Sequence, residues 1–553
     1  MVMSDMQSTL KEYVKQATLN VYQNEEFAKD IVVEIPRDPS MADYATTIAM
    51  RLAKPLKTSP MIIAEKIVEE LKKISKDYNS IEAVKPGFIN FKMKKSALAD
   101  SINAIINAGE TYGHNDTGIN EPKINLEYVS ANPTGDLHVG HARAAAWGDS
   151  IARLMLASGY SVLREYYIND AGHQIDMLGE SLIARYFEHF GRKDYPIPEN
   201  GYHAQDIIDI ANNIAEKDGD KWLDADPHER LEYFKTTGKK LELEKIKDDL
   251  RNFRVEFDSW MPESYFYENN DARIKKCLDD MKEKGVLYES EGALWLKTTL
   301  FNDDKDRVLV KNDGSFTYFL PDIANNMYKF ERGYQKLIIL LGADHHGYVA
   351  RMQAALACLG HPNSLEIDLE QMVRLVEDGK EVKMSKRTGN GISLRELCDD
   401  VGVDAVRYSF AARELGAHMD FDLGLVRKKS NENPVYYAQY AFARAHNILV
   451  EARGFVAPAK YDLLVDPKET EIMKTLMEFP NVVANAAKTR APNMICTYVQ
   501  KLAGYFHSYY ASCKINDSKN PELTNERLGL VKATEIVLKN ALNLIGVSAP
   551  EKM

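Results

Sequence analysis

The sequence is poor in cysteine, and its few thiols are scattered. It has 5 cysteines among 553 residues, and none of them forms a Cys-x-x-Cys pair. Zinc ribbons and disulfide frameworks depend on paired spacings, so neither is predicted. Scattered cysteines are typical of proteins in the reducing cytosol, and we expect a cytoplasmic location. The cysteines are Cys277, Cys358, Cys398, Cys496 and Cys513.

Long apolar runs and an excess of positive charge are also missing. No apolar stretch approaches the roughly 18 residues of a membrane helix, and the first residues contain no apolar signal core, so we expect neither a membrane span nor a signal peptide. The formal net charge is −12, which argues against a protein that coats nucleic acid non-specifically. A local aromatic or basic RNA surface is still compatible with that charge, because a whole-chain sum averages over domains.

What the chain does contain is the composition of a multi-domain globular protein. Apolar residues make up 45% and charged residues 27% of it, and its length suits about three to five domains. Residues 123–130 alternate like a strand, a helical pattern then runs to about residue 157, and 161–170 have the pattern of a second strand. This strand–helix–strand order predicts the beginning of a parallel sheet.

Segments with other patterns flank and interrupt that sheet. The first part of the chain combines strand patterns at 31–35 and 87–93 with a helical pattern at 41–56. Residues 196–300 are polar and highly charged, which predicts an insertion, whereas the apolar run 336–346 predicts a later parallel strand with a ligand-binding polar end. After residue 396 the pattern is nearly all helical.

These patterns predict an α/β fold. It consists of a Rossmann-type parallel-sheet catalytic domain with an insertion, an N-terminal α+β domain and a C-terminal all-helical bundle. The expected boundaries are 1–115 for the N-terminal domain, 116–195 and 301–395 for the two halves of the parallel-sheet domain, 196–300 for the insertion, 396–433 for a helical stem and 434–553 for the bundle.

The segment HVGH places two histidines three residues apart, directly after a proline-containing turn. In the first turn of a helix His138 and His141 share a face, and a helix N-terminus beyond a first parallel strand favours anions. Gly140 between them costs about 1 kcal/mol in a helix, which the close approach of a flat ligand such as a nucleotide base would justify. The tetrapeptide alone leaves three interpretations open, namely a metal site, a phosphate site or two surface histidines.

Two further segments carry charged or metal-ligating side chains. Lys383, Lys386 and Arg387 stand between glycines, as in a mobile loop that closes on a polyphosphate, although a basic surface loop is the alternative. The sequence GADHHG at 342–347 allows a metal cluster or the Asp-His-His signature of a phosphoesterase family. That family needs further aspartate motifs near the N-terminus, which we do not find, so we favour a polar strand end that lines a pocket.

Together, the two phosphate-binding candidates resemble the signatures of class I aminoacyl-tRNA synthetases. These signatures are a His-x-Gly-His after the first strand and a Lys-Met-Ser-Lys loop after the last, here separated by about 240 residues and an insertion. Further stretches resemble the arginyl-tRNA synthetase family over essentially the whole chain. Many members of that family have a degenerate second signature, whereas it is complete here. The stretches are 126–149, 166–179, 316–324, 342–360, 434–449 and 546–553.

This resemblance implies a reaction and its partners. ATP would activate L-arginine to arginyl-adenylate, and the arginyl group would pass to the 3′-terminal ribose of tRNA(Arg) by attack of the 2′-hydroxyl, with release of AMP and diphosphate. The arginine carboxylate is already ionised, so catalysis needs positioning and charge stabilisation rather than a general base. The resemblance further implies Mg²⁺ as part of the ATP complex, no tightly bound protein metal, and activation that depends on tRNA. We expect a monomer.

The resemblance also assigns the residues that contact the small substrates. A guanidinium has five donors and a fixed charge, so carboxylates and an aromatic face suit it. Each of three of these residues also has a possible structural role: Glu127 in an ion pair, Asp322 as a helix cap and Tyr318 in the core. The arginine set is Glu127, Asp322 and Tyr318 for the guanidinium, Ser130 and Asn132 for the ammonium and carboxylate, and His345. The catalytic set is His138, His141, Lys383 and Lys386, and the ATP set adds Gly140, Gly342, Asp344, Met384 and Ser385.

Aromatic residues in the first and last domains match the family's RNA contacts. Unpaired bases are recognised by stacking and edge hydrogen bonds as much as by charge. Ordinary packing is the alternative for each of these residues. The resemblance assigns Phe88 and Asn90 to the tRNA elbow, and Tyr437, Tyr440, Tyr510 and Met553 to the anticodon.

Other functions would use parts of the same pattern. Small nucleotidyltransferases also contain His-x-Gly-His, but they are far shorter and would leave the helical C-terminal region unexplained. A non-catalytic RNA-binding relative should have lost phosphate ligands that are all present here. Adenylate formation without transfer to tRNA would favour the nucleotidyltransferase, and bound metal with phosphodiester hydrolysis would favour the phosphoesterase.

Overall fold

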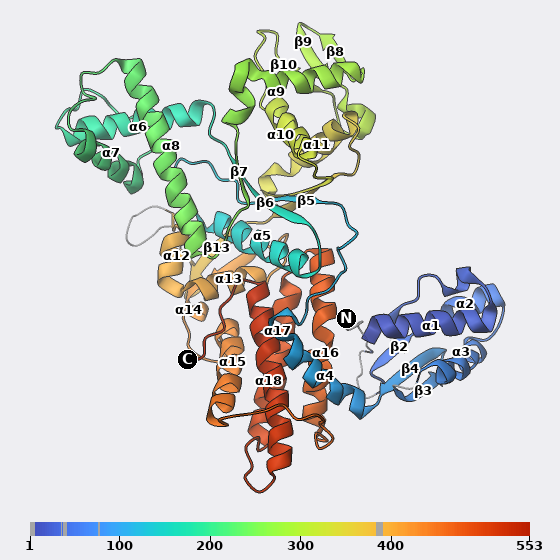
Figure 1. Cartoon of the computed structure of the whole chain (residues 1–553). Helices are drawn as coiled ribbons and strands as arrows, with labels where there is room; N and C mark the ends of the chain where they lie inside the picture. The colour runs from blue at the N-terminus through green and yellow to red at the C-terminus, as the bar shows by residue number, and fades with distance from the viewer. Residues whose placement is uncertain (1–5, 35, 37–40, 76–77, 383–390) are drawn as a thin grey trace.

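A five-stranded parallel sheet lies at the centre of the computed structural model, which describes residues 6–34, 36, 41–75, 78–382 and 391–553 (Figure 1). Its strand order is β12-β11-β5-β6-β7. The first strand stands in the middle, so the direction of winding reverses between β5 and β11. The strands are β5 (Ile124–Glu127), β6 (Val162–Ile168), β7 (Ser259–Pro262), β11 (Lys336–Gly342) and β12 (Leu365–Glu370).

Both faces of the central sheet are buried, as parallel sheets require. Along β11, Ile338 and Leu340 belong to a core shared with helix α5 (Val139–Ala157), whereas Leu337 and Ile339 belong to a second core. That second core also contains residues of α9 (Ser264–Glu283), α10 (Phe319–Glu331) and α11 (His346–Cys358). Both faces are therefore closed, and the open part of the sheet is its carboxyl edge.

Helix α5 packs closely against the residue that follows β5. A Cβ atom at Gly148 would lie 2.4 Å from the ring of Tyr128, which is fully buried. Only glycine permits this approach. The helix is otherwise rich in alanine, the strongest helix former, and ends at Ala157 as its periodicity predicts.

The range 196–300 is not a single insertion, which corrects the predicted domain boundary. Helices α6 (His173–His189), α7 (Gln205–Asp218) and α8 (Pro227–Asn252) form a unit with its own core between β6 and β7. Strand β7 then returns to the central sheet beside β6. The chain leaves again as α9 and the antiparallel strands β8 (Leu287–Ser290), β9 (Ala293–Leu296) and β10 (Arg307–Val310). Only four residues form β7, too few for a recognisable period among charged helices.

The N-terminal unit is an antiparallel sheet of order β1-β2-β4-β3 with helices packed on it. The helix predicted for 41–56 is partly wrong, because its first residues form strand β2, where Tyr44 pairs with Phe91. The predicted alternation in β4 is confirmed, with Ile89 and Phe91 buried and Phe88 and Asn90 half-buried on the other face. The elements are α1 (Met6–Tyr22), β1 (Val33–Glu34), β2 (Tyr44–Thr46), α2 (Ile48–Leu56), α3 (Pro60–Ile74), β3 (Tyr78–Val84) and β4 (Phe88–Met93).

The C-terminal region is a helical bundle onto which the N-terminal unit docks through α4 (Lys95–Ala108) (Figure 1). Asn103 of α4 donates to the carbonyl of Pro458 over 2.9 Å, and the Tyr112 hydroxyl donates to the carbonyl of Leu476 over 3.0 Å. The bundle helices are α15 (Pro434–Glu451), α16 (Pro467–Thr489), α17 (Asn493–Ser512) and α18 (Pro521–Leu544). The predicted fold class is thereby confirmed.

A small sheet of order β14-β13-β15 joins the central sheet to the bundle. Its strand β15 interrupts the nearly all-helical pattern predicted after residue 396, because these four residues find a parallel partner in β13. The junction consists of β13 (Val373–Glu377), β14 (Lys380–Glu381), α12 (Leu394–Val401), α13 (Val403–Ala411), β15 (Met419–Asp422) and α14 (Leu423–Val426). Within the described residues, no helix is long and apolar enough to cross a lipid bilayer.

Candidate active site

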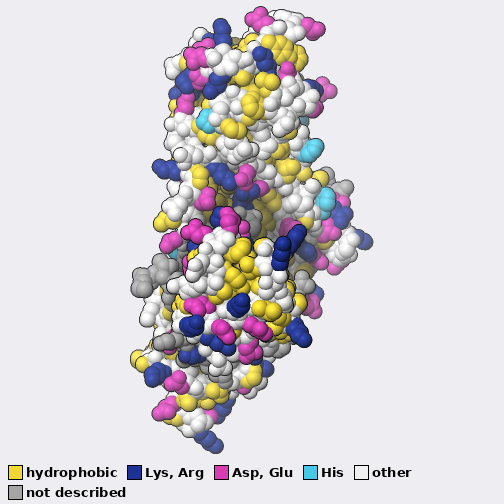
Figure 2. Space-filling view, turned by 90° about the vertical axis from the view of Figure 1, so that its right-hand side faces the viewer, with side chains coloured by type: hydrophobic (Ala, Val, Ile, Leu, Met, Phe, Trp, Pro, Cys, Tyr) yellow, Lys and Arg dark blue, Asp and Glu magenta, His cyan; other side chains and the backbone are white. Residues whose placement is uncertain are grey.

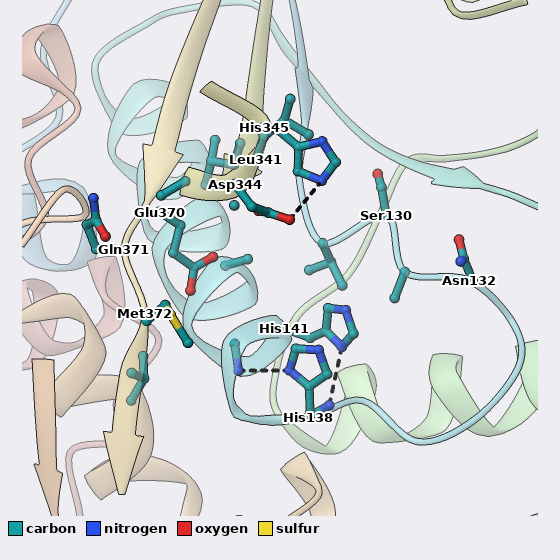
Figure 3. A pocket seen from close by; sticks show the side chains of 18 of the residues that line it. Ser130, Asn132, His138, His141, Leu341, Asp344, His345, Glu370, Gln371 and Met372 are labelled. Atoms are coloured by element: carbon teal, nitrogen blue, oxygen red, sulfur yellow. Dashed lines mark hydrogen bonds and ion pairs between the residues drawn. The ribbon is translucent and has the colours of Figure 1, made fainter. Parts of the chain in front are cut away.

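The carboxyl ends of β5, β11 and β12 border a cavity of about 1020 Å³ (Figure 3). It lies where the winding of the sheet reverses, the usual ligand-binding place in such folds. Residues from both halves of the predicted parallel-sheet domain meet in it. The predicted site residues in its lining are Ser130, Asn132, His138, Gly140, His141, Gly342, Asp344 and His345.

The two histidines form the start of helix α5. His138 is the N-cap, with its Nδ1 accepting from the amide of Gly140 over 3.1 Å, and Nδ1 of His141 accepts from the amide of His138 over 3.2 Å. The rings stack with centroids 3.7 Å apart (Figure 3). A nitrogen that accepts carries no proton, so each neutral ring holds its proton on Nε2. Both rings therefore have an Nε2–H donor available at a helix N-terminus.

Burial keeps the two rings uncharged. It lowers the pKa of His138, and burial together with the neighbouring His138 lowers the pKa of His141 to about 3. A Cβ atom at Gly140 would lie 3.0 Å from the His138 ring, so the glycine gives room to that ring. The pair is thus a neutral double donor. No group of three or more His, Cys, Asp or Glu side chains in the described part of the chain has the arrangement of a metal site.

The Lys-Met-Ser-Lys motif lies outside the described residues. The predicted site residues in it are Lys383, Met384, Ser385, Lys386 and Arg387. The chain that follows them is described and begins beside the histidines. The amide of Leu394 donates to the carbonyl of Leu137 over 2.6 Å, and Ser393 forms a β-bridge with His138. The fold therefore brings the segment that follows the Lys-Met-Ser-Lys motif next to the His-x-Gly-His motif.

Asp344 and His345 extend from the end of β11 into the same cavity (Figure 3). Asp344 Oδ2 lies 3.6 Å from His345 Nε2, and their side chains are 82% and 55% exposed. Such accessible polar groups at a strand end are free to meet a ligand, and this matches the strand-end interpretation of the sequence GADHHG.

The turn after β5 has a strained backbone. Val129 has a φ of 71° and Ser130 a φ of 42°, values that β-branched and other non-glycine residues rarely adopt. Such residues cost about 1–3 kcal/mol each and concentrate at functional sites. The Ser130 hydroxyl donates to Glu127 Oε1 over 3.2 Å and accepts from the amide of Tyr167 over 3.1 Å. Asn132, in the same turn, donates to Gln174 of α6.

Glu127 has a cation partner within the protein. Its Oε2 pairs with Lys329 of α10, whose side chain is fully buried. Lys329 also lies 3.9 Å from Glu165, which in turn pairs with Arg332 over 2.5 Å. The structural ion pair considered for Glu127 is therefore present, and a substrate guanidinium would have to share this carboxylate with Lys329.

The carboxylates Asp322 and Glu263 form no close ion pair among the described residues, although Arg351 is near enough to Asp322 to oppose the rise of its pKa. Burial, then Glu263 and Glu127, raise the pKa of Asp322 to about 7, although it accepts a hydrogen bond from the Tyr348 hydroxyl. Burial and then Asp170 raise the pKa of Glu263. Two unpaired carboxylates in a buried place favour a cationic ligand.

Glu263 and Tyr167 lie close to Asp322 and Glu127, and the sequence interpretation missed both of them. Burial and the neighbouring Glu263, Asp322 and Glu127 raise the pKa of Tyr167, and its buried hydroxyl finds no hydrogen-bond partner among the described residues. Glu263 directly follows β7, and Tyr167 lies in β6. The signal was the usual one, a polar residue at the carboxyl end of a strand, but β7 was hidden in the charged insertion.

Tyr318 takes no part in the lining of the cavity. Its side chain is 84% exposed, and it stands at the start of α10 one turn before Asp322. The core position considered for it is wrong, since it faces solvent. Its contact with arginine stays a prediction.

The bundle presents a connected aromatic face on α15 and α17. Tyr440 stacks with Tyr436 at 6.1 Å and with His507 at 5.7 Å between ring centroids. Arg444 lies over Tyr440 at 4.5 Å and over Tyr510 at 4.3 Å. Tyr437 packs against His507 at 4.6 Å. The exposed Tyr510 and Met553 suit contact with a partner, whereas the neighbouring Tyr509 is fully buried.

The surface charges are mixed in sign. Figure 2 shows acidic and basic side chains interleaved on the face that carries the N-terminal unit. The half-buried Phe88 and Asn90 of β4 belong to this unit. Base stacking and edge hydrogen bonds would suit such a surface better than phosphate attraction.

Three family models match successive parts of the chain. They are described as the arginyl tRNA synthetase N terminal domain, at residues 7–93, the tRNA synthetases class I (R) catalytic domain, at 101–409, and the DALR anticodon binding domain, at 438–553. The chain is 47% identical over 559 residues to the arginine–tRNA ligase of Geobacillus kaustophilus strain HTA426, and all of both chains is covered. It is also 47% identical over 558 residues to the arginine–tRNA ligase of Bacillus subtilis strain 168, again over both whole chains.

A solved structure has the same fold. Thermus thermophilus arginyl-tRNA synthetase matches with a TM-score of 0.77 at 22% sequence identity, covering 99% of this chain and 100% of that one. The likeness includes the N-terminal unit, the central sheet and the helical bundle in one arrangement.

Proposed function

Because the chain belongs to the arginyl-tRNA synthetase family, we propose that the cavity at the ends of β5, β11 and β12 is where ATP meets arginine. The chain is a class I enzyme that activates arginine with ATP and transfers it to tRNA. One observation carries the residue assignments. A neutral double donor, His138 and His141, lines the cavity together with Ser130. The Ser130 hydroxyl donates to Glu127, and Glu127 is close enough to Asp322 to raise its pKa, as Glu263 also does.

The histidine side takes the phosphates of ATP. An oxygen of the arginine carboxylate attacks the α-phosphorus, the bond to the β-phosphate oxygen breaks, and diphosphate leaves with Mg²⁺ from the substrate complex. Nε2–H of His138 and of His141 donates to the phosphate oxygens that gain charge. Gly140, Gly342 and Asp344 border the nucleotide. Lys383 and Lys386, with Met384 and Ser385, contribute charge and hydrogen bonds to the β- and γ-phosphates, an assignment that rests on the sequence signature.

The carboxylate side takes the guanidinium of arginine. Asp322 and Glu263 accept hydrogen bonds from the guanidinium. Glu127 adds negative charge nearby, although Lys329 neutralises part of it. The Tyr167 hydroxyl, which has no hydrogen-bond partner among the described residues, is a further acceptor. The side-chain oxygens of Ser130 and Asn132 accept from the ammonium of arginine, and the side-chain N–H of Asn132 donates to its carboxylate, which orients both groups toward ATP. His345, and Tyr318 after a movement of its exposed side chain, are further contacts carried by the resemblance.

The second step transfers the arginyl group to RNA. The 2′-hydroxyl of the terminal ribose attacks the activated carbonyl, and AMP leaves. The aromatic face of α15 and α17, with Tyr437, Tyr440, Tyr510 and Met553, stacks on anticodon bases of tRNA(Arg). Phe88 and Asn90 contact an unpaired base at the elbow. We place the enzyme in the cytoplasm as a monomer.

Parallel charging reactions test this function. One purified tRNA(Arg) is incubated with ATP and each labelled amino acid in turn, and only arginine is expected to become acid-precipitable. Equal charging by lysine would contradict the carboxylate pocket, because lysine cannot supply bidentate contacts.

Arginine-dependent exchange of diphosphate into ATP is expected only when tRNA is present. Robust exchange without tRNA would refute that dependence and leave the ligase activity intact.

A further inference from the structure

Helix α8 carries two lysines that pair with carboxylates on different segments of the parallel-sheet domain, one before His138 and one after β6. Nζ of Lys245 lies 2.5 Å from Asp136 Oδ1, and Nζ of Lys239 lies 2.9 Å from Asp170 Oδ2. Asp136 lines the cavity in the turn that leads to His138. Asp170 follows β6 and accepts from both the amide and the hydroxyl of Ser264, each over 2.8 Å.

Lys245 is the cation at the centre of a carboxylate cluster. Besides Asp136, its Nζ lies 3.0 Å from Asp206 of α7 and 3.9 Å from Glu242, whose side chain is fully buried. Burial, opposed by Lys245 and assisted by Asp206 and Asp136, raises the pKa of Glu242 to about 8. Burial alone would lower the pKa of Lys245, but Glu242, Asp136 and Asp206 outweigh it and raise that pKa. Lys245 is thus charged, and it is the group that holds Asp136 and Asp206 together.

We propose that Lys245 is a positioning residue for arginine activation, which holds the turn 132–138 so that His138 and His141 meet the phosphates of ATP. This inference rests on the proposed function of the cavity. Two residues of the turn reach toward the inserted helices: Asn132 donates to Gln174 of α6, and Asp136 pairs with Lys245 of α8. The insertion therefore contributes to catalysis without touching a substrate.

Removing the Lys245 cation should displace the turn. Asp136 and Asp206 would then face each other with no positive charge between them, and Asp206 is too buried to turn to solvent. Asp136 is the more exposed of the two and would move away, carrying the backbone before His138 with it. A small misplacement of groups that hold reacting atoms can lower a rate by about 10²-fold.

Lys239 gives a matched contrast on the same helix. The side chains of Lys239 and Lys245 are similarly exposed, at 31% and 28%, and each pairs with a carboxylate, Asp170 and Asp136 respectively. Lys239 acts through Asp170 and Ser264 on the neighbouring Glu263, which belongs to the arginine side. Lys240 serves as the control on the same helix. Its side chain is 73% exposed, and its Nζ lies 4.0 Å from Glu244, a weak surface pair.

The test measures tRNA-dependent diphosphate exchange in the full-length enzyme, with KM for ATP and for arginine determined separately. Lys245→Met is expected to lower kcat/KM for ATP by about 10- to 100-fold and to leave KM for arginine within about twofold. Lys239→Met is expected to raise KM for arginine and leave KM for ATP. Lys240→Met should match the wild type. Lys245→Arg, which keeps the charge, should recover most of the loss, and Asp136→Asn combined with Lys245→Met should add little to the single change.

Two results would overturn the positioning role. One is a Lys245→Met enzyme whose kinetic constants equal those of Lys240→Met. The other is a Lys245→Met enzyme that loses ATP and arginine affinity to the same extent and in step with a lower melting temperature, because a loosened fold would do the same. If the wild-type enzyme shows no arginine-dependent exchange with tRNA present, the proposed function itself fails, whatever the variants do.

Discussion

At the scale of single residues, the proposed contact of Asp322 with arginine predicts that arginine binding depends on pH. Its pKa is raised to about 7 by burial and by the neighbouring Glu263 and Glu127. A guanidinium binds the ionised carboxylate, so arginine lowers this pKa, and affinity is present above pH 7 and is lost as the pH falls through 7. Between pH 8 and pH 6 we expect KM for arginine to rise about tenfold, measured at saturating ATP and tRNA.

A neutral substitution isolates this effect. Asp322→Asn should raise KM for arginine at every pH and remove most of its dependence on pH, since the titrating group is gone. An arginine KM in the wild type that stays constant from pH 6 to pH 8 would show that Asp322 does not bind the guanidinium in its ionised form.

The histidine pair makes a prediction that concerns rate rather than affinity. Replacing His141 by Ala removes one Nε2–H donor from the phosphates, and removal of such a donor typically raises the barrier by about 2.7–4 kcal/mol. We therefore expect kcat to fall by about 10²- to 10³-fold, with KM for arginine unchanged. Diphosphate exchange measures the change, and circular dichroism checks that α5 has formed. A loss confined to KM for ATP would mean that His141 binds ground-state ATP only.

Local sequence could identify these residues but not their partners. The spacing of His138 and His141 after a predicted strand was enough to place them at a helix start. The spacing could not show that the His141 ring accepts from the amide of His138 or that the His138 ring accepts from the amide of Gly140, because both contacts depend on side-chain rotamers. The ion pair of Glu127 with Lys329 spans 202 residues and was beyond any local pattern.

At the scale of secondary-structure elements, α15 and α17 form the aromatic face proposed for anticodon recognition. Tyr440 is its central residue, because it contacts Tyr436, His507 and Arg444. Tyr440→Ala should raise KM for tRNA in aminoacylation by roughly 5- to 150-fold, in line with the 1–3 kcal/mol typical of base stacking. KM for ATP should not change, since the active site lies in another part of the molecule.

Tyr436→Ala is a suitable comparison for Tyr440→Ala. It removes a stacked ring next to Tyr440 but leaves Arg444 over Tyr440 and Tyr510. A smaller rise in KM for tRNA is expected. An unchanged KM for tRNA in Tyr440→Ala would remove this tyrosine from the RNA-binding set.

Element prediction succeeded where the period was long and failed for short strands. Helix α5 and strand β6 follow their periodic patterns closely. The strands β2, β7 and β15 have three or four residues each and were missed. Such segments become strands because a partner strand supplies hydrogen bonds, as β6 does for β7, and a partner distant in sequence leaves no local signal. Missing β7 also concealed Glu263.

At the scale of the whole molecule, one buried arginine joins three parts of the chain. Arg407 of α13 is fully buried and pairs over 2.5 Å with Asp149 of α5. It also donates over 3.0 Å to the carbonyl of Phe253, after α8, and over 3.0 Å to that of Ile545, after α18. The order of the domains followed from sequence patterns and resemblance, but this junction did not, because its members lie between 138 and 258 residues apart along the chain.

Arg407 should therefore matter more for stability than any exposed ion pair. Arg407→Leu removes the buried partner of Asp149 and leaves it only the more exposed Arg153, and breaking a buried pair in this way costs about 3–5 kcal/mol. The exposed pair of Arg374 with Asp420, at 60% and 52% exposure, is the control, and Arg374→Leu should cost at most about 1 kcal/mol. Urea midpoints followed by tryptophan fluorescence report both changes. The double variant Arg407→Leu, Asp149→Leu should be more stable than Arg407→Leu alone, because no charge stays buried. If the double variant is the less stable of the two, the carbonyls of Phe253 and Ile545, rather than Asp149, account for the effect of Arg407.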